Sequence, residues 1–110
     1  MADAIEAQLA AYNAQDLDAF CACYHDDVRV EDGNGTVLST GIAVFRQKYA
    51  ALFAREPANR ADVVQRMRVG PWVIDEERVT GRSSPDLHVV ALYRLRGDRI
   101  AFVRFLVEGD

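Results

Sequence analysis

Residues 87–107, LHVVALYRLRGDRIAFVRFLV, hold two apolar runs that are separated by the pair Gly97-Asp98. Both runs are rich in β-branched and aromatic side chains, which favour extended strands, and a Gly-Asp pair is typical of a tight turn. A connection this short leaves no room for a helical crossover. The two strands are therefore predicted to pair antiparallel.

The same period of two extends back toward the middle of the chain. Residues 63–69 and 72–80 each have the pattern of a strand, and Gly70-Pro71 separates them. The polar loop 81–86 then leads into the strand that begins at Leu87. Because their connections are short, the last three strands suit an antiparallel meander.

The first residues carry helical signals instead. Residues 3–6 have the pattern of a capping box, and Ile5, Leu9 and Tyr12 recur on one face of a helix. Asp16 is placed to cap a second, short helix. Together these segments predict a helical hairpin at the start of the chain.

A strand, a turn and a third helix are expected next. Residues 27–31 alternate polar and apolar side chains, residues 32–35 are dense in turn formers, and residues 36–39 can pair back as a hairpin. Thr40 is expected to cap the third helix, which Pro57 stops.

This order of elements, with helices first and long strands last, indicates the α+β class. Helices would pack on one face of a bent, mainly antiparallel sheet. The chain has 110 residues, of which 50% are apolar and 27% charged. That length suits one core, so residues 1–110 are predicted to form a single domain.

Composition narrows the choice of partners and location. A net charge of -4 and a pI near 5.1 argue against nucleic acid, whose phosphates need a basic surface. No stretch approaches the roughly 20 apolar residues of a membrane span, and residues 1–4 lack the basic and apolar parts of a secretory signal. Cys21 and Cys23 fit small apolar fillers in a reducing compartment. We therefore expect a cytoplasmic protein.

The last strand, residues 100–107, is apolar on both of its faces. One face can cover the core, and the other needs a cover of its own. A loop or the C-terminus could supply it, but a second copy of the chain is the simplest cover, so we expect a homodimer through the sheet. Arg104 on that face could then pair across the interface.

Three stretches together resemble a known family. Residues 12–18 (YNAQDLD), residues 24–32 (YHDDVRVED) and residues 41–45 (GIAVF), followed by the long strands, are similar to ketosteroid isomerase and other SnoaL-like proteins of the nuclear-transport-factor-2-like superfold. The resemblance implies a cone of three N-terminal helices on a curved sheet, enclosing one apolar pocket. The superfold hosts isomerases, cyclases, epoxide hydrolases, dehydratases and non-catalytic modules, so the fold alone does not assign an activity.

The resemblance also implies a catalytic residue. The family's general-base aspartate falls on Asp32, where a carboxylate beside an apolar pocket could move a proton next to a carbonyl. The alternative is that Asp32 only forms the turn before Gly33. Gln8 and Ala91 stand where the family has its oxyanion-binding tyrosine and aspartic acid. The sequence thus departs from the isomerase pattern at both donors.

Further candidates for catalysis come from tyrosines and a histidine. Tyr12, Tyr49 and Tyr93 could each donate a phenol hydrogen bond to a substrate oxygen, or could serve as core packing with a satisfied hydroxyl. His88, alone on its strand, could act as an acid or base, or could be a structural histidine.

The register of the strands suggests which side chains bind substrate. Glu76 and Arg78 share a face with Trp72 and are expected to look into the pocket, or to form a solvated salt bridge where the strand leaves the core. By the same register, the substrate-binding set also includes Ala91, Val103 and Phe105. Metal-ligand spacing and a phosphate-binding loop are both missing from the sequence, so no metal or cofactor is expected.

Two functions fit these observations. The first is a cofactor-free enzyme that acts by proton transfer, as an isomerase, cyclase or dehydratase, on a small apolar carbonyl or hydroxyl compound. The second is a non-catalytic ligand-binding or dimerisation module of the same fold. A cavity in which a carboxylate and a phenol converge favours the enzyme, whereas a filled or purely apolar cavity favours the module.

Overall fold

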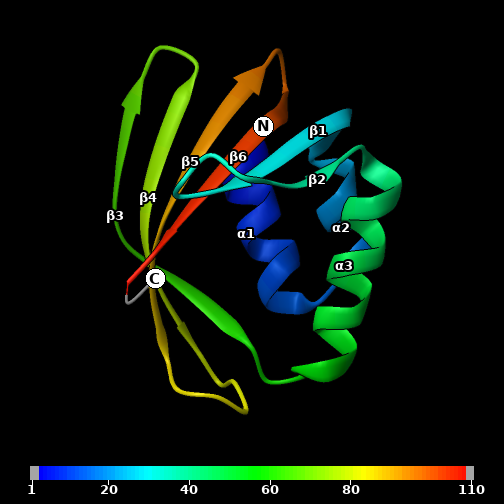
Figure 1. Ribbon diagram of the computed structural model, residues 1–110, viewed down its shortest axis with the longest axis vertical. Helices are drawn as coiled ribbons and strands as arrows, with labels where there is room; N and C mark the ends of the chain where they lie inside the picture. The colour runs from blue at the N-terminus through cyan, green and yellow to red at the C-terminus, as the bar shows by residue number, and fades with distance from the viewer. Residues whose placement is uncertain (1–2, 109–110) are drawn as a thin grey trace.

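The helices and the sheet form two layers in the computed structural model, which describes residues 3–108 (Figure 1). The elements are α1 (Ala4–Ala14), α2 (Leu17–Ala22), β1 (Tyr24–Asp32), β2 (Val37–Thr40), α3 (Ile42–Arg55), β3 (Arg60–Val69), β4 (Trp72–Thr80), β5 (Leu87–Arg96) and β6 (Arg99–Val107). The three helices lie toward one face of the sheet. The predicted α+β class with three N-terminal helices is confirmed.

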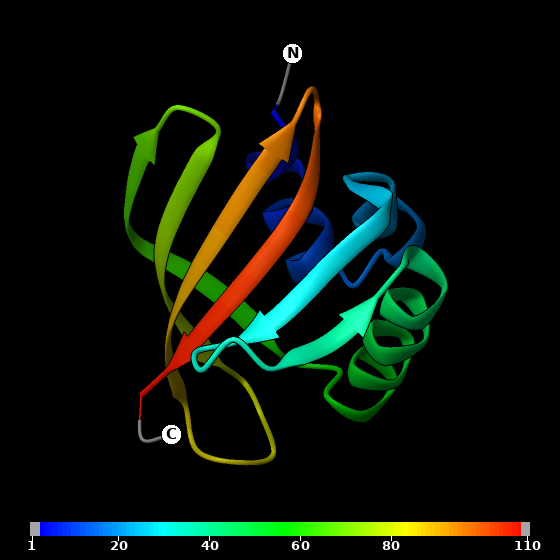
Figure 2. The same cartoon turned by 45° about the horizontal axis from the view of Figure 1, so that its top comes forward.

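The six strands have the order β2-β1-β6-β5-β4-β3. All neighbours pair antiparallel except β1 and β6, which are parallel. Figure 2 shows the strands side by side, with α1 behind the sheet and α3 beyond the short edge strand β2. The antiparallel meander that the sequence predicts extends over β3 to β6.

Local signals set most of the element boundaries. The Asp3 carboxylate accepts a hydrogen bond from the backbone N–H of Glu6 at 2.9 Å, and Asp16 caps α2 in the same way through Ala19. The expected cap of α3 is wrong: Gly41, not Thr40, occupies the N-cap position. Gly41 has a φ of +89°, and its N–H donates to the Val28 carbonyl, so the chain turns sharply from β2 into α3 there.

The strand that was expected over residues 27–31 starts earlier, at Tyr24. Tyr24 pairs with Ile100 of β6, and the Ile100 N–H donates to the Cys23 carbonyl at 2.9 Å. This parallel pairing joins segments that are far apart in the sequence, so the alternation of residues 27–31 does not reveal it.

Aromatic side chains fill the space between the helices and β1. Phe20 is almost fully buried at the centre, stacked on Phe45 with 5.6 Å between ring centroids and 4.7 Å from the ring of Tyr49. Tyr24 lies 4.4 Å from Phe45. These rings make one contiguous wall that carries the phenol groups described below.

The outer face of the sheet mixes apolar and charged side chains. Trp72 meets Phe102 edge-on at 6.0 Å, and the Arg94 guanidinium lies over the Trp72 ring. Leu106 on the same face is 41% exposed. Within residues 3–108, no helix is long and apolar enough to cross a membrane.

The loop 81–86 is held against the segment that follows α3. Gly81 has a φ of +73°, and a Cβ atom added there would lie 1.9 Å from the Ala58 carbonyl oxygen. Next to it, both oxygens of the buried Glu56 carboxylate accept hydrogen bonds from Ser83, one from its N–H and one from its hydroxyl, each at 2.8 Å. The loop is therefore fixed by a close backbone approach and by a carboxylate clamp.

We expect Gly81→Ala to destabilise the fold more than Gly97→Ala. Both glycines have positive φ, where a Cβ costs about 1–2 kcal/mol, but the space around Gly97 is open. At Gly81 the Ala58 carbonyl must also move. Urea unfolding of the two variants measures the difference. Equal losses of stability would mean that the approach of Gly81 to Ala58 is not a constraint.

Candidate functional site

A cavity of about 290 Å³ lies between the helices and the concave face of the sheet. Most of its wall is apolar, with Leu9, Leu52, Val79, Val89 and Phe105 among the lining residues. The polar groups that line it are Gln8, Tyr12, Tyr24, Tyr49, Asn59, Glu77, Arg82 and Tyr93. A few polar groups on an apolar wall are typical of a small-molecule site.

A row of hydrogen bonds crosses the cavity wall and ends on a carboxylate. The Tyr24 hydroxyl donates to Gln8 Oε1 at 3.0 Å, and Gln8 Nε2 donates to the Tyr93 hydroxyl at 3.3 Å. The Tyr93 hydroxyl in turn donates to Glu77 Oε2 at 3.4 Å. Residues from α1, β1, β4 and β5 are thereby tied into one polar network.

Glu77 is the acidic group of this cavity. Its side chain is buried on the concave face of β4. Burial raises the pKa of Glu77 to about 7, and the nearby charge of Asp75 adds to the rise, while the Tyr93 hydrogen bond and Arg66 oppose it. Near neutral pH, Glu77 can therefore both take up and release a proton, which general acid–base catalysis requires.

Asp75 stands two residues before Glu77 on the same face and is fully buried. Arg66 binds it with two hydrogen bonds, Nε to Oδ1 at 2.6 Å and Nη2 to Oδ2 at 2.9 Å. Arg66 also pairs with Glu6 of α1. This arrangement matches the charge of Asp75 but leaves Glu77 without a cation of its own within 4.0 Å, as far as residues 3–108 show.

Tyr12 and Asn59 form a second polar group in the cavity. Asn59 Nδ2 donates to the Tyr12 hydroxyl, and burial raises the pKa of Tyr12, so the phenol keeps its proton at neutral pH. The oxygen of Tyr12 is thus an acceptor from Asn59, and its O–H remains available to donate. Asn59 itself is 4% exposed, and its Oδ1 is buried with no partner among the described residues.

The structure brings some of the predicted site residues together. Tyr12, Tyr49, Tyr93 and Phe105 all line the cavity. Ala91 and Val103 are buried in the core but are not part of the cavity wall.

Asp32 is the last residue of β1, directly before the turn, and is not among the residues that line the cavity. Its Oδ1 accepts hydrogen bonds from the backbone N–H groups of Asn34 and Thr36, both at 2.9 Å. This is the turn-forming role that the sequence offered as the alternative for Asp32.

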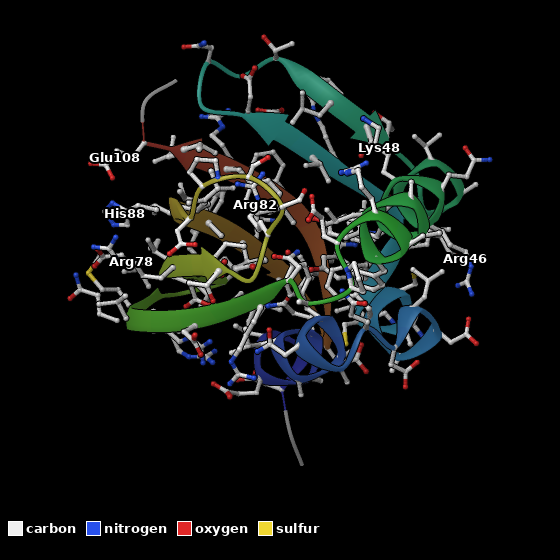
Figure 3. All side chains as sticks on the ribbon, turned by 90° about the horizontal axis from the view of Figure 1, so that it is seen from below. Arg46, Lys48, Arg78, Arg82, His88 and Glu108 are labelled. Carbon is white, nitrogen blue, oxygen red and sulfur yellow. The ribbon has the colours of Figure 1, made fainter. Side chains whose placement is uncertain are left out.

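The predicted inward face of β4 is the outer face in the structure. Trp72, Glu76 and Arg78 point away from the cavity, because residues 73, 75, 77 and 79 are the buried set of this strand. Figure 3 shows Arg78 and His88 on the outer side of the sheet, while Arg82 lies near the centre on loop 81–86. The expectation that Glu76 and Arg78 look into the pocket is therefore corrected.

His88 is part of a salt bridge cluster on that outer face. Its Nε2 lies 2.7 Å from a Glu76 oxygen and its Nδ1 lies 2.9 Å from a Glu108 oxygen. The hydrogen bond to Glu76, followed by that to Glu108, raises the pKa of His88. These contacts agree with the structural alternative for His88. Glu76 forms its salt bridge with His88 and not with Arg78, which has no ion pair among residues 3–108.

The sequence pattern did not identify Glu77, Asn59 and Arg82 as candidate site residues. The predicted pocket position of Tyr93 could have identified Glu77, because paired residues on neighbouring antiparallel strands point to the same face of the sheet. Tyr93 pairs with Val73 across β4 and β5, and the face that starts at Val73 continues through Asp75 and Glu77. Asn59 and Arg82 lie in connections, where periodicity gives no information.

A family model described as the SnoaL-like domain matches residues 5–103 of the chain. The chain belongs to the SnoaL-like domain family. The resemblance predicted from the sequence is confirmed, and with it the cone-shaped, nuclear-transport-factor-2-like fold.

Several solved structures are similar to this chain over most of their length. An uncharacterized cystatin fold protein from Novosphingobium aromaticivorans is 36% identical, covers 93% of each chain and has a TM-score of 0.84. A putative ketosteroid isomerase from Kribbella flavida is 16% identical over 97% of this chain and 76% of that one, with a TM-score of 0.81. A putative polyketide cyclase from Sinorhizobium meliloti is 19% identical over 96% and 94%, with a TM-score of 0.82. The comparison with curated proteins gave no match.

The raised pKa of Glu77 should make the fold less stable as the pH rises. Between pH 4.5 and about 7, the folded chain holds a proton on Glu77 that the unfolded chain has released. The stabilisation that comes from this bound proton is fully present below pH 4.5 and is lost above about pH 7. The free energy of unfolding should fall by about 3 kcal/mol over this range. Glu77→Gln should not show this loss. Urea unfolding of both proteins from pH 5 to 8 measures it, and parallel stability curves would contradict the raised pKa.

Proposed function

We propose that this SnoaL-like protein is a cofactor-free enzyme that transfers a proton on a small apolar carbonyl or hydroxyl compound, with Glu77 as the general acid–base. The observation that supports it is one buried carboxyl, with a pKa of about 7, on the wall of an apolar cavity. The cavity is neither filled nor purely apolar, which are the features that would favour a non-catalytic module.

The geometry supports a division of roles between Glu77 and Tyr12. Glu77 Oε2 accepts the Tyr93 hydroxyl, while Oε1 has no hydrogen-bond partner among residues 3–108 and is available to a substrate proton. Glu77 takes a proton from a carbon next to a carbonyl, and Tyr12 donates its O–H to the carbonyl oxygen as negative charge develops there. Asn59 supports this donation by directing its own N–H to the phenol oxygen.

The row from Tyr24 through Gln8 to Tyr93 holds Glu77 in place. Because Gln8 stands where the related isomerases have their tyrosine donor, its role here is different: it accepts from Tyr24 and donates to Tyr93. Tyr93 uses its proton on Glu77, so in this arrangement it positions the base rather than the substrate oxygen. Tyr12 and Tyr49 are the cavity phenols whose O–H has no acceptor among residues 3–108, and of the two it is Tyr12 that Asn59 orients.

We expect Glu77→Gln to lower proton transfer by about 10²–10⁴-fold, because Gln accepts no proton. The substrate need not be known: small apolar ketones are incubated with the protein in deuterated water, and deuterium uptake next to the carbonyl is followed by mass spectrometry. Glu76→Gln is the matched control, since it is the neighbouring carboxylate on the opposite face. It should exchange at the wild-type rate.

Two outcomes of this experiment would overturn the proposal. If Asp32→Asn abolishes exchange and Glu77→Gln does not, the base is Asp32, as the family register implies. If several ketones bind but none exchanges faster with wild type than with Glu77→Gln, the chain is the non-catalytic binding module instead.

We also propose that the chain acts as a homodimer through the outer face of its sheet. Trp72, Phe102 and Leu106 give this face apolar area between its charged groups. Light scattering should give twice the 12.3 kDa chain mass. Leu106→Glu should reduce it to one chain, whereas Val44→Glu, on α3 and equally 41% exposed, should not. A wild-type mass of one chain, or equal effects of both changes, would contradict the dimer.

A further inference from the structure

Arg82 brings a positive charge to a cavity whose wall is otherwise apolar, neutral polar or acidic. Among the described residues that line the cavity, it is the one basic side chain. It comes from loop 81–86, which the Gly81 approach and the Glu56–Ser83 hydrogen bonds fix in position. Figure 3 shows it between the sheet and α3. The proton-transfer mechanism proposed above assigns it no role.

Among residues 3–108, no carboxylate matches the charge of Arg82. Most arginines of the chain form an ion pair, as Arg66 does with Asp75, but no carboxylate within residues 3–108 lies within 4.0 Å of Arg82. One hydrogen bond, from Nη1 to the Pro85 carbonyl at 2.7 Å, orients the side chain. The remaining N–H groups are available to a ligand, and a guanidinium offers them in a fork that fits a carboxylate.

Glu56 is the acidic neighbour that could compete for Arg82. Both of its oxygens already accept hydrogen bonds from Ser83, which, ahead of the Arg82 charge, lower its pKa. Glu56 also does not line the cavity. The guanidinium therefore faces a space in which a ligand, and not Glu56, can supply the counter-charge.

A second observation points to a ligand at the same end of the cavity. Asn59 is buried, lines the cavity and has an amide oxygen without a partner among the described residues. This buried amide oxygen needs a donor, which a hydroxyl of a ligand or a water would supply, and leaving it without one is costly. Asn59 and Arg82 follow Ala58 and Gly81 in the sequence, and the backbones of Ala58 and Gly81 approach closely, so these two cavity residues come from adjacent segments.

We propose that the ligand of this cavity is a small apolar acid whose carboxylate binds Arg82. This names the substrate class of the function proposed above and rests on it. A single guanidinium matches the single charge of a carboxylate, and Leu9, Leu52 and Val89 offer an apolar wall for the body of the ligand. A cavity of about 290 Å³ limits that body to a small ring system or a short branched chain. The acid end at Arg82 then leaves the carbon skeleton to reach toward Glu77.

The test compares acids with amides of the same shape. Binding of 2-naphthoate and 2-naphthamide, and of cyclohexylacetate and cyclohexylacetamide, is measured by calorimetry on the full chain at neutral pH. Wild type should bind at least one acid about 10- to 100-fold more tightly than its amide. Arg82→Gln should remove this preference, and Arg82→Lys should keep part of it because the charge remains. Arg99→Gln is the control. Arg99 is exposed, has no ion pair within residues 3–108 and does not line the cavity.

If wild type binds acid and amide equally, or binds neither, in both pairs, the inference is overturned. It is also overturned if Arg82→Gln still prefers the acid, or if Arg99→Gln loses the preference to the same extent. Glu77→Gln separates this result from the catalytic proposal, because it should still prefer the acid. If neutral ketones exchange with Glu77 dependence while no acid is preferred, the enzyme stands and the ligand class fails. If the acid preference depends on Arg82 but no compound exchanges, the ligand class stands and catalysis by Glu77 fails.

Discussion

A buried carboxyl group either has its charge matched by a cation or keeps its proton, and the concave face of β4 carries one of each kind. Arg66 matches Asp75 with two hydrogen bonds and also reaches Glu6, so one guanidinium joins β3, β4 and α1. With that cation occupied, Glu77 faces an apolar cavity and the unfavourable charge of Asp75. The chemistry of the site thus depends on an ion pair that does not itself touch the cavity.

The polar groups of the cavity fall into two sets, those that hydrogen-bond one another and those with unused hydrogen-bonding atoms. Tyr24, Gln8 and Tyr93 satisfy one another in a row and end on Glu77, so few of their hydrogen-bonding atoms are left over. Tyr12, Asn59 and Arg82 differ from that row, since each keeps hydrogen-bonding capacity that the described residues do not use. The groups with all their hydrogen bonds formed within the protein hold the site in shape, and the groups with unused hydrogen-bonding atoms are the ones that can bind a ligand.

Local patterns predicted most of the helices and strands, but neither the parallel pairing of β1 with β6 nor the site. The strands after residue 60 and the caps at Asp3 and Asp16 follow from periodicity and hydrogen-bonding chemistry within a few residues. The orientation of β4 depends on its pairing with β5 across the loop 81–86, and a shift of one residue exchanges Glu76 for Glu77 as the cavity residue. For Asp32 the family resemblance implied a general base, but its carboxylate accepts hydrogen bonds from the backbone of the following turn.

The aromatic residues are divided between the two faces of the sheet in a way that bears on spectroscopy. All four tyrosines of the chain line the cavity, whereas the single tryptophan lies on the outer face, edge-on to Phe102. The two kinds of chromophore therefore report on separate compartments of the same small protein. Near-ultraviolet signals from tyrosine follow what enters the cavity, and tryptophan emission follows what covers the outside of the sheet.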